Sequence, residues 1–225
     1  MRNTNDHCKG RNELMNALLL CNGEPPGKTL CRRLARDSDF IVAADGGANI
    51  ARRYGIRPHL IIGDLDSVTP STRQHFASVP TIRVKRQDNT DLEKALDELV
   101  RRKAVSVTIL GATGRRIDFT LGNLSVLWSY TEKLDIIVAG ASWKAYPMRK
   151  RFTLNAGPGT IVSLIPFGRC SGITLSGLRY PLRNADMPVG HIGASNVVTR
   201  SAFSVRVERG RMLVIVFDDL HRRPR

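Results

Sequence analysis

Residues 40–49 and 59–67 read FIVAADGGAN and HLIIGDLDS, and these two stretches decide the fold. In each, a short apolar run leads directly into glycine and aspartate. Short apolar runs that alternate with amphipathic segments are the pattern of a parallel sheet wrapped by helices. The acidic, glycine-rich residues would then lie just beyond the carboxyl ends of the strands, where open parallel sheets bind their ligands.

The same alternation extends outward from these stretches, from Asn16 to Ala139. The third expected helix is the best defined, because Thr90 and Glu93 form a capping box at its start. The expected strands are NALLLC (16–21), FIVAA (40–44), HLII (59–62), TIRV (81–84), VSVTIL (105–110) and DIIVA (135–139), and the expected helices cover 27–37, 47–54, 90–102 and 117–131.

After about residue 145 the character of the sequence changes. Gly and Pro become frequent, and turn signals separate short β-branched runs such as TIVSLI, SNVVT, FSVRV and MLVIVF. The sequence therefore predicts an α/β fold joined to an all-β one. A domain with a parallel sheet wrapped by helices is expected over 12–142, and a small β-sandwich over 146–220. The first fifteen or so residues are expected to be disordered.

Length and composition narrow the class of protein. A chain of 225 residues with 42% apolar residues can bury a substantial core. It has no apolar run of membrane-spanning length and no signal-peptide pattern in its first dozen residues, so a soluble, cytoplasmic protein without a membrane partner is expected. The four cysteines have no CxxC spacing, which predicts free thiols and argues against a zinc site: Cys8, Cys21, Cys31 and Cys170.

The formal net charge of +15 would by itself suggest a nucleic-acid-binding protein. The arginines, however, occur in scattered pairs, mostly on or beside predicted helices. No segment matches a recognition helix, a zinc finger or an aromatic RNA-binding strand. A solvated basic surface that also attracts small polyanions is the better interpretation, and a nucleic-acid partner is not expected.

Acidic residues gather at the predicted carboxyl edge of the sheet. Asp64 and Asp66 are two apart, and in an extended segment that spacing sends both carboxylates to the same side. Hard oxygen ligands of this kind suit Mg²⁺. An isolated DxD would more simply be a turn with solvated acids, but Asp45, Asp91 and Asp118 fall at the same edge. Such a cluster would repel itself unless cations bind there.

Other features of this edge have two interpretations each. Asp91 in the first turn of a helix is favoured by the helix dipole, with or without a function. Lys94, one turn later, could reach a phosphate or only neutralise Asp91. The glycines of DGGAN and GATG permit backbone approach to a phosphate, or only a tight turn. GATGRR is neither GxGxxG nor a Walker loop, so a nicotinamide enzyme or a P-loop kinase is not expected.

Taken in order, DGGAN (45–49), GDLDS (63–67), QDNTDLEKAL (87–96) and GATGRRIDFTLGN (111–123) resemble the motif series of the thiamine pyrophosphokinase family. In the second half, GITLSGLRYPL (172–182) and GASN (193–196) resemble the thiamine-binding β domain of that family. Together these segments span most of the chain. The resemblance implies transfer of a diphosphate group from ATP to thiamine, giving AMP and thiamine diphosphate, by a Mg²⁺-dependent homodimer that binds thiamine near the protomer interface.

The resemblance also implies roles for individual residues. The implied metal ligands and catalytic acids are Asp64, Asp66 and Asp91, with Asp118 as a further catalytic acid. The implied contacts to nucleotide and thiamine are Asp45, Gly46, Gly47, Asn49, Gln87, Lys94 and Arg116 for ATP, and Ser195 and Asn196 for thiamine. Gly114-Arg115-Arg116 stands where Gly-Gly-Arg is expected, and Asp118-Phe119 where Asp-His is expected. Either Asp91 or Asp118 could accept the proton of the attacking hydroxyl.

Two other functions remain open from the residues alone. A metal-dependent nucleotide hydrolase would use the same aspartates with water as nucleophile, but it would leave the β domain without a task. A basic nucleic-acid-binding protein rests on the net charge alone, and a steep salt dependence of DNA binding would support it.

Overall fold

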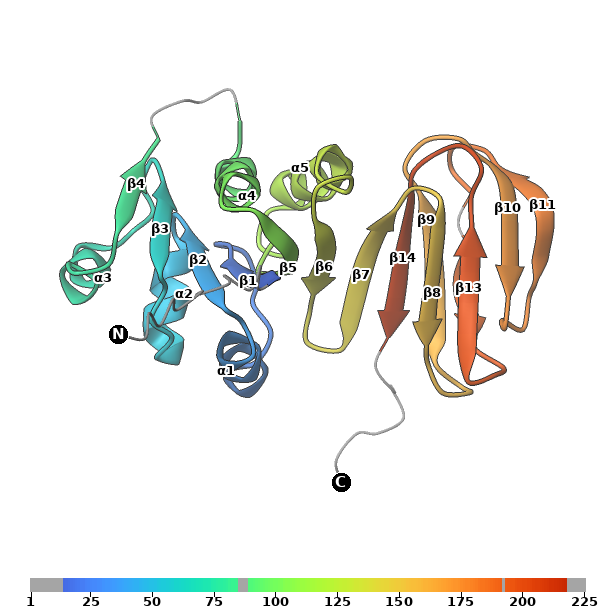
Figure 1. Cartoon of the computed structure of the whole chain (residues 1–225), viewed down its shortest axis with the longest axis horizontal. Helices are drawn as coiled ribbons and strands as arrows, with labels where there is room; N and C mark the ends of the chain where they lie inside the picture. Colours follow the sequence, from blue (N-terminus) through green and yellow to red (C-terminus); the bar gives the residue numbers. More distant parts are fainter. Residues whose placement is uncertain (1–13, 85–88, 192, 218–225) are drawn as a thin grey trace, which may run out of the picture.

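The computed structural model describes residues 14–84, 89–191 and 193–217. They form a ten-stranded mixed sheet, a four-stranded antiparallel sheet and helices that pack on the N-terminal half of the larger sheet (Figure 1). The elements are β1 (Met15–Leu20), α1 (Lys28–Arg36), β2 (Phe40–Ala44), α2 (Gly47–Tyr54), β3 (Leu60–Gly63), α3 (Pro70–His75), β4 (Thr81–Arg83), α4 (Asp91–Arg101), β5 (Ala104–Leu110), α5 (Ile117–Val126), the 3₁₀ helix η1 (Leu127–Ser129), β6 (Asp135–Ala139), β7 (Trp143–Met148), β8 (Arg151–Asn155), β9 (Ile161–Pro166), β10 (Cys170–Ser176), β11 (Leu182–Met187), β12 (Gly193–Val197), β13 (Ala202–Arg206) and β14 (Met212–Phe217).

The strand order locates the place where a ligand would bind. The parallel strands are arranged β6-β5-β1-β2-β3-β4, so the chain builds one side from β1 and then returns to the other side with β5. The order therefore reverses between β1 and β5. The loops after these strands meet there, because Gly23 N–H donates to the Gly111 carbonyl (2.7 Å) and Glu24 N–H donates to the Thr113 carbonyl (2.7 Å). Open α/β sheets bind ligands at such a switch point.

Alternate residues of β1, β2 and β3 enter two different cores. Leu19 of β1 packs in a cluster with Leu96 of α4, whereas Leu18 and Leu20 pack in a second cluster with Ala48 of α2. The two-residue period of a strand sends neighbouring side chains to opposite faces. These three strands are thus covered on both faces, which explains why they are largely apolar.

The larger sheet does not end where the sequence changes character. β7 pairs with β6 in antiparallel fashion, with Val138 opposite Ala145, and β14, β9 and β12 continue the sheet. The expected start of the second domain, residue 146, therefore lies inside β7. The small sheet, in the order β11-β10-β13-β8, packs on this extension through a core that includes Leu164, Phe203 and Val214.

Trp128 joins the helical half to the extension. Its side chain is buried, its Nε1 donates to the Met148 carbonyl (3.2 Å), and its ring lies 4.5 Å from that of Phe167 between centroids. Arg149, at the end of β7, hydrogen-bonds the Trp128 carbonyl and forms an ion pair with Glu132. The turn after α5 is therefore tied to the connection between β7 and β8.

The structure confirms the expected strands of the parallel sheet and the four expected helices, the last of which divides into α5 and η1. The structure also contains a short helix that was not expected, α3, which Thr69 caps and Pro70 begins. The expected free thiols are confirmed for Cys21, Cys31 and Cys170, and all three are buried. Cys8 and the segment 1–13, expected to be disordered, lie outside the described residues. In the described part of the chain, no helix is long and apolar enough to cross a membrane.

Candidate active site

A cavity of about 770 Å³ lies at the carboxyl edge of the parallel strands. The loop after β1 contributes Cys21, Asn22 and Gly23, and the ends of β2 and β3 contribute acidic residues. The segment 89–94 at the start of α4 and the loop after β5 complete its wall. The cavity therefore coincides with the reversal of strand order between β1 and β5.

Three carboxylates converge in this cavity, from three different elements. Asp45 follows β2, Asp64 follows β3 and Asp91 begins α4, and one oxygen of each lies within 4.8 Å of the others. Asp45 is only 4% exposed, and its Oδ1 is buried without a hydrogen-bond partner in the described structure. A buried carboxylate oxygen without a donor is costly unless a cation or another ligand satisfies it. The group therefore fits a hard divalent cation.

Both the charge and the backbone conformation of Asp45 are unfavourable in this structure. Burial raises the pKa of its carboxyl group, and the nearby charges of Asp91 and Asp66 raise it further, against hydrogen bonds from Ser67 and the Gly46 backbone that lower it. A bound cation would oppose this shift, because it favours the carboxylate form. The backbone of Asp45 is also left-handed, at φ 43°. Strain of this kind is found at functional sites.

The two glycines after Asp45 serve packing in this structure. A Cβ on Gly47 would meet the Leu20 carbonyl oxygen at 2.0 Å, so the start of α2 can approach β1 only without a side chain. Neither Gly46 nor Gly47 is among the cavity-lining residues. Their expected contact with nucleotide therefore has the simpler alternative that the sequence left open, a tight turn.

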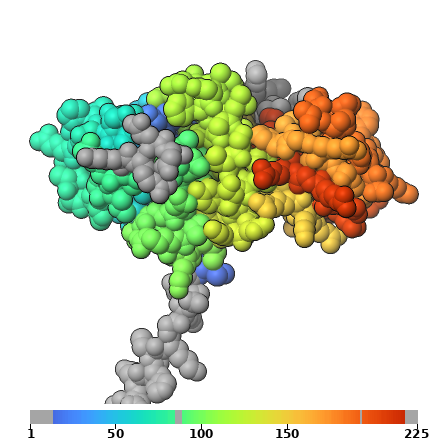
Figure 2. All heavy atoms as spheres, turned by 90° about the horizontal axis from the view of Figure 1, so that it is seen from above, coloured from blue at the N-terminus to red at the C-terminus, as the bar shows by residue number. Residues whose placement is uncertain are grey.

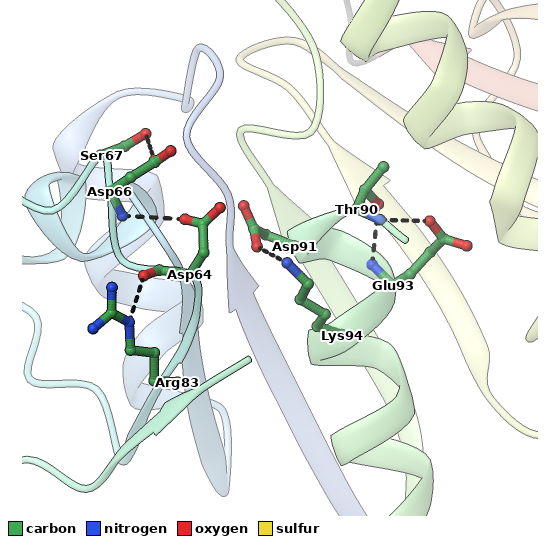
Figure 3. A network of polar contacts seen from close by, with 8 residues as sticks. All are labelled: Asp64, Asp66, Ser67, Arg83, Thr90, Asp91, Glu93 and Lys94. Atoms are coloured by element: carbon green, nitrogen blue, oxygen red, sulfur yellow. Dashed lines mark hydrogen bonds and ion pairs between the residues drawn. The ribbon is translucent and has the colours of Figure 1, made fainter. Parts of the chain in front are cut away.

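Asp64 and Asp66 do not share one side of an extended segment, and that expectation is wrong. Leu65 between them is left-handed, at φ 70°, and this turns the chain. The Asp66 N–H donates to Asp64 Oδ1 (3.1 Å), and the Asp66 carboxylate accepts from the Ser67 hydroxyl (2.9 Å). Figure 3 shows Asp64 directed toward Asp91 and Asp66 directed toward Ser67. Asp66 lines the cavity but lies outside the three-carboxylate group.

The start of α4 brings a lysine to the carboxylates. The predicted capping box is confirmed: Thr90 N–H donates to Glu93 Oε2 (2.8 Å), and Glu93 N–H donates to Thr90 Oγ1 (3.3 Å). This cap fixes the first helical turn, which carries Asp91. Lys94 is buried, and its Nζ lies 2.9 Å from Asp91 Oδ1 (Figure 3). Lys94 therefore offsets part of the negative charge of the cluster.

Arg116 and Asp118 form an exposed ion pair at the start of α5. Arg116 Nε donates to Asp118 Oδ1 (3.1 Å), and its guanidinium lies over the Phe119 ring, 4.5 Å from the centroid. The hydrogen bond from Arg116 lowers the pKa of Asp118. Arg116 and Phe119 line the cavity, whereas Asp118 is not among its lining residues. A carboxylate with a lowered pKa is a weaker proton acceptor.

Asn49 acts on the loop after β3. Its Nδ2 donates to the Ser67 carbonyl (2.8 Å), and its Oδ1 accepts from the Thr69 N–H (3.1 Å). Both ends of the amide are thus used within the protein, and Asn49 is not a lining residue of the cavity. It holds the loop that carries Asp64 and Asp66. Gln87, an expected ATP contact, lies outside the described residues.

Ser195 and Asn196 lie in β12, in the extension of the larger sheet. Ser195 is exposed and left-handed, at φ 57°, and its N–H donates to Ser163 Oγ (3.1 Å). Asn196 is buried, accepts from the Tyr180 N–H (3.0 Å) and donates to the Tyr180 carbonyl (2.8 Å). Asn196 therefore braces the loop after β10. Of the two, Ser195 has the side chain that is open to a ligand.

Several residues after β1 and β5 line the cavity although they were not among the expected site residues. Asn22 and Gly23 line the cavity, and the rule that ligands bind beyond strand ends would have selected them after NALLLC. Cys21 also lines it, and burial raises the pKa of its thiol to about 12. Asn123 contributes from α5, where its Nδ2 donates to the Ala112 carbonyl (2.8 Å).

Two family models match the chain. The model described as "Thiamin pyrophosphokinase, catalytic domain" matches residues 31–138, and the one described as "Thiamin pyrophosphokinase, vitamin B1 binding domain" matches residues 151–212. Thiamine pyrophosphokinase 3 of Oryza sativa subsp. japonica is 30% identical over 224 residues, covering 85% of this chain and 82% of that protein. Thiamine pyrophosphokinase of Bacillus subtilis is 28% identical, covering 77% of this chain and 85% of that protein.

Solved structures share the fold. The crystal structure of thiamine pyrophosphokinase from Bacillus subtilis has a TM-score of 0.79 at 24% identity, covering 91% of this chain and 100% of that one. Thiamin pyrophosphokinase from Candida albicans has a TM-score of 0.81 at 19% identity, covering 92% of this chain and 90% of that one. These likenesses agree with the sheet topology described above, and the family models cover both halves of it. The chain belongs to the thiamine pyrophosphokinase family.

Proposed function

We propose that the protein transfers the diphosphate of ATP to the hydroxyl group of thiamine, giving thiamine diphosphate and AMP. The observation that carries this proposal is the convergence of Asp45, Asp64 and Asp91 in the cavity of a chain that belongs to this family. The thiamine oxygen would form a bond to the β-phosphorus, and the bond from that phosphorus to the bridging oxygen of the α-phosphate would break. The hydroxyl proton is released.

The three converging carboxylates would hold Mg²⁺. They provide oxygen ligands from rigid element ends, and one oxygen of Asp45 has no other partner in the described structure. Bound Mg²⁺ would neutralise phosphate oxygens and align the triphosphate, the main requirement of phosphoryl transfer. Asp66 lines the same cavity but lies outside the three-carboxylate group. We therefore expect Asp66 to contribute less to activity than the three converging carboxylates.

The protein's own residues would orient the substrates and receive the proton. Lys94 lines the cavity, and its ammonium group can donate to a phosphate oxygen while it stays beside Asp91. Arg116 also lines the cavity and offers a planar guanidinium for the same purpose. Asp118 does not line the cavity, and the hydrogen bond from Arg116 lowers its pKa, which makes it a weaker proton acceptor. We therefore assign the proton acceptor to a carboxylate of the cavity.

We further propose that the two halves of the chain divide the work. The Rossmann-like half, residues 12–142, would bind ATP at the switch point between β1 and β5. The second half, residues 146–220, would form a β-sandwich that binds thiamine. Ser195 supports this division, because its side chain is exposed on β12. Its backbone is also left-handed, a conformation that is unfavourable for serine and is found more often at functional sites.

We propose that the active protein is a homodimer in which a second copy covers α5. None of the residues of α5 is buried, and three large apolar side chains face solvent: Ile117 is 72% exposed, Leu121 56% and Phe119 50%. In Figure 2 the yellow-green atoms of this region form part of the outer face of the molecule. Apolar surface of this kind marks an interaction site. Phe119 also lines the cavity, so a second copy seated here would complete its wall.

Replacing Leu121 with Asp should convert the dimer to a monomer and lower activity, because it places a charge in an apolar contact. Sedimentation velocity at several protein concentrations would measure the mass, and circular dichroism would check the fold. Leu14, which is 70% exposed and distant in the chain from α5, provides the matched control as Leu14→Asp. A fully active Leu121→Asp monomer would defeat the shared-site proposal.

Ser195→Ala and Asn196→Ala should differ in kind. Loss of one hydrogen bond from Ser195 to thiamine should raise the KM for thiamine by about 2- to 10-fold, with the KM for ATP unchanged. Asn196→Ala should instead lower stability, by about 1 to 3 kcal/mol, because the Tyr180 backbone loses buried partners. Steady-state kinetics with each substrate varied, together with thermal unfolding, separates the two effects. An unchanged KM for thiamine in Ser195→Ala would move the acceptor site elsewhere.

The proposed reaction can be tested against its nearest alternative. Purified protein should release AMP from ATP only when thiamine and a divalent cation are both present, and chelation of the cation should stop the release. Added Mg²⁺ should restore it. AMP released at the same rate without thiamine would identify a nucleotide hydrolase and overturn the proposal.

A further inference from the structure

Arg115 occupies a backbone conformation that favours glycine. It lies in the loop between β5 and α5, at φ 57°. Two other residues of this loop, Gly111 at φ 69° and Gly114 at φ 85°, are left-handed and are glycines. Arg115 is thus a left-handed residue with a Cβ, in a loop that otherwise uses glycine for this purpose. A left-handed residue with a Cβ is uncommon, and such residues concentrate at functional sites.

The side chain of Arg115 differs from the other cavity cations in its partners. Among the residues that the structure describes, the cationic side chains lining the cavity are Lys94, Arg115 and Arg116. Lys94 is paired with Asp91, and Arg116 is paired with Asp118. The described contact of Arg115 is with a neutral group: its Nη1 lies 3.4 Å from Asn22 Oδ1. Among the described residues, Arg115 is therefore the cavity-lining cation for which no ion pair with a carboxylate is found.

The position of β5 in the sheet separates Arg115, in the loop that follows it, from the acidic cluster. Arg115 follows β5 and Asn22 follows β1, whereas Asp45 and Asp64 follow β2 and β3. The order β5-β1-β2-β3 places β5 three strand spacings from β3, which is roughly 14 Å at about 4.8 Å per spacing. One end of the cavity is therefore acidic and suited to a metal. The other end, at the switch point, carries a cation.

We propose that Arg115 binds phosphate oxygens of the nucleotide at the switch-point end of the cavity and thereby strengthens the binding of ATP. The inference rests on the proposed function and adds to it a nucleotide contact that a glycine at this position could not make. A guanidinium is suited to the task, because its planar donors match two oxygens of a phosphate at once. The neutral contact with Asn22 orients the side chain without cancelling its charge.

Binding of a non-hydrolysable ATP analogue with Mg²⁺, measured by calorimetry, tests this inference directly. Arg115→Ala should raise the dissociation constant about 10-fold, because a charge-assisted hydrogen bond is lost. Arg115→Lys keeps the charge but loses the planar pair of donors, so about a 3-fold weakening is expected. Arg33→Ala removes an exposed arginine of α1 that is not a lining residue, and it should leave binding unchanged.

Arg115→Gly adds a readout that a purely structural role would not give. Glycine relieves the left-handed strain, so the thermal midpoint of this variant should not fall, although the analogue should bind about 10-fold more weakly. Added salt should weaken analogue binding more in the unmutated protein than in Arg115→Ala, since only the former retains the guanidinium charge. If Arg115→Ala does not fold, Arg115→Gly and Arg115→Lys carry the test.

Two results would overturn the inference: analogue binding unchanged in the folded Arg115 variants, or equal weakening in Arg33→Ala, which would indicate a general effect of net charge. Failure of the proposed function looks different. If the unmutated protein formed no thiamine diphosphate but the Arg115 variants still bound the analogue more weakly, the reaction would be rejected and the role of Arg115 would stand.

Discussion

Replacing Asp64 with Asn is expected to lower kcat/KM for thiamine diphosphate formation by roughly 100- to 1,000-fold, and by more if the metal is lost altogether. Asp64 is one of three carboxylates whose oxygens converge within 4.8 Å, so its loss removes a charged ligand from the group. The fold should persist, because Asp64 follows a strand end and is only partly buried. Steady-state kinetics over a range of Mg²⁺ concentrations, with circular dichroism on the same samples, measures both effects.

Asp66→Asn is the matched control for this experiment. It removes the same chemical group two residues away, but Asp66 lies outside the three-carboxylate group. We expect a clearly smaller loss of activity for Asp66→Asn than for Asp64→Asn, Asp45→Asn or Asp91→Asn. A folded Asp64→Asn protein with near-normal activity would remove Asp64 from the metal site. Equal losses for Asp64 and Asp66 would show that both hold the metal or its phosphate.

Trp128→Ala is expected to lower the free energy of unfolding by about 3 to 5 kcal/mol, the usual cost of truncating a large buried aromatic side chain. Trp128 is 1% exposed and packs on Phe167 across the junction between the helical half and the antiparallel strands. For a chain of this length each 1 kcal/mol shifts the thermal midpoint by roughly 2 to 4 °C, so the midpoint should fall by roughly 10 °C. Differential scanning calorimetry would measure it.

The variant Trp128→Phe separates packing from hydrogen bonding at this junction. It keeps an aromatic ring but removes the Nε1–H that donates to the Met148 carbonyl (3.2 Å). A smaller loss of about 1 to 3 kcal/mol is expected, from the smaller ring and the unsatisfied carbonyl. If Trp128→Ala and Trp128→Phe were equally mild, the junction would not depend on this side chain.

The parts of the fold that local pattern controls could be predicted from the sequence. The apolar runs around Leu18 and Val42 gave the parallel strands, because a strand buried on both faces must be apolar throughout. The start of α4 could be predicted from Thr90 and Glu93, because a capping box depends only on residues three apart in the sequence. Since ligands gather beyond strand ends, the positions of Asp45, Asp64 and Asp91 also followed.

The parts that depend on single backbone conformations and distant partners could not be predicted. The left-handed backbone of Leu65 leaves Asp66 outside the three-carboxylate group, and the two-residue spacing of Asp64 and Asp66 does not reveal this turn. The role of Asn196 depends on Tyr180, 16 residues earlier, whose backbone it binds from both ends of its amide. The change in composition near residue 145 suggested two separate domains. The pairing of β6 with β7 instead carries one sheet across that boundary.

The central claim, transfer of an intact diphosphate group to thiamine, is tested most directly with ATP labelled at one phosphate at a time. The protein would be incubated with Mg²⁺, thiamine and each labelled ATP, and the products separated and identified by mass. The account predicts that label from the β- and γ-phosphates appears in thiamine diphosphate, that label from the α-phosphate stays in AMP, and that the two products form in equal amounts. Transfer of the γ-label alone, with ADP and thiamine monophosphate as products, would contradict it.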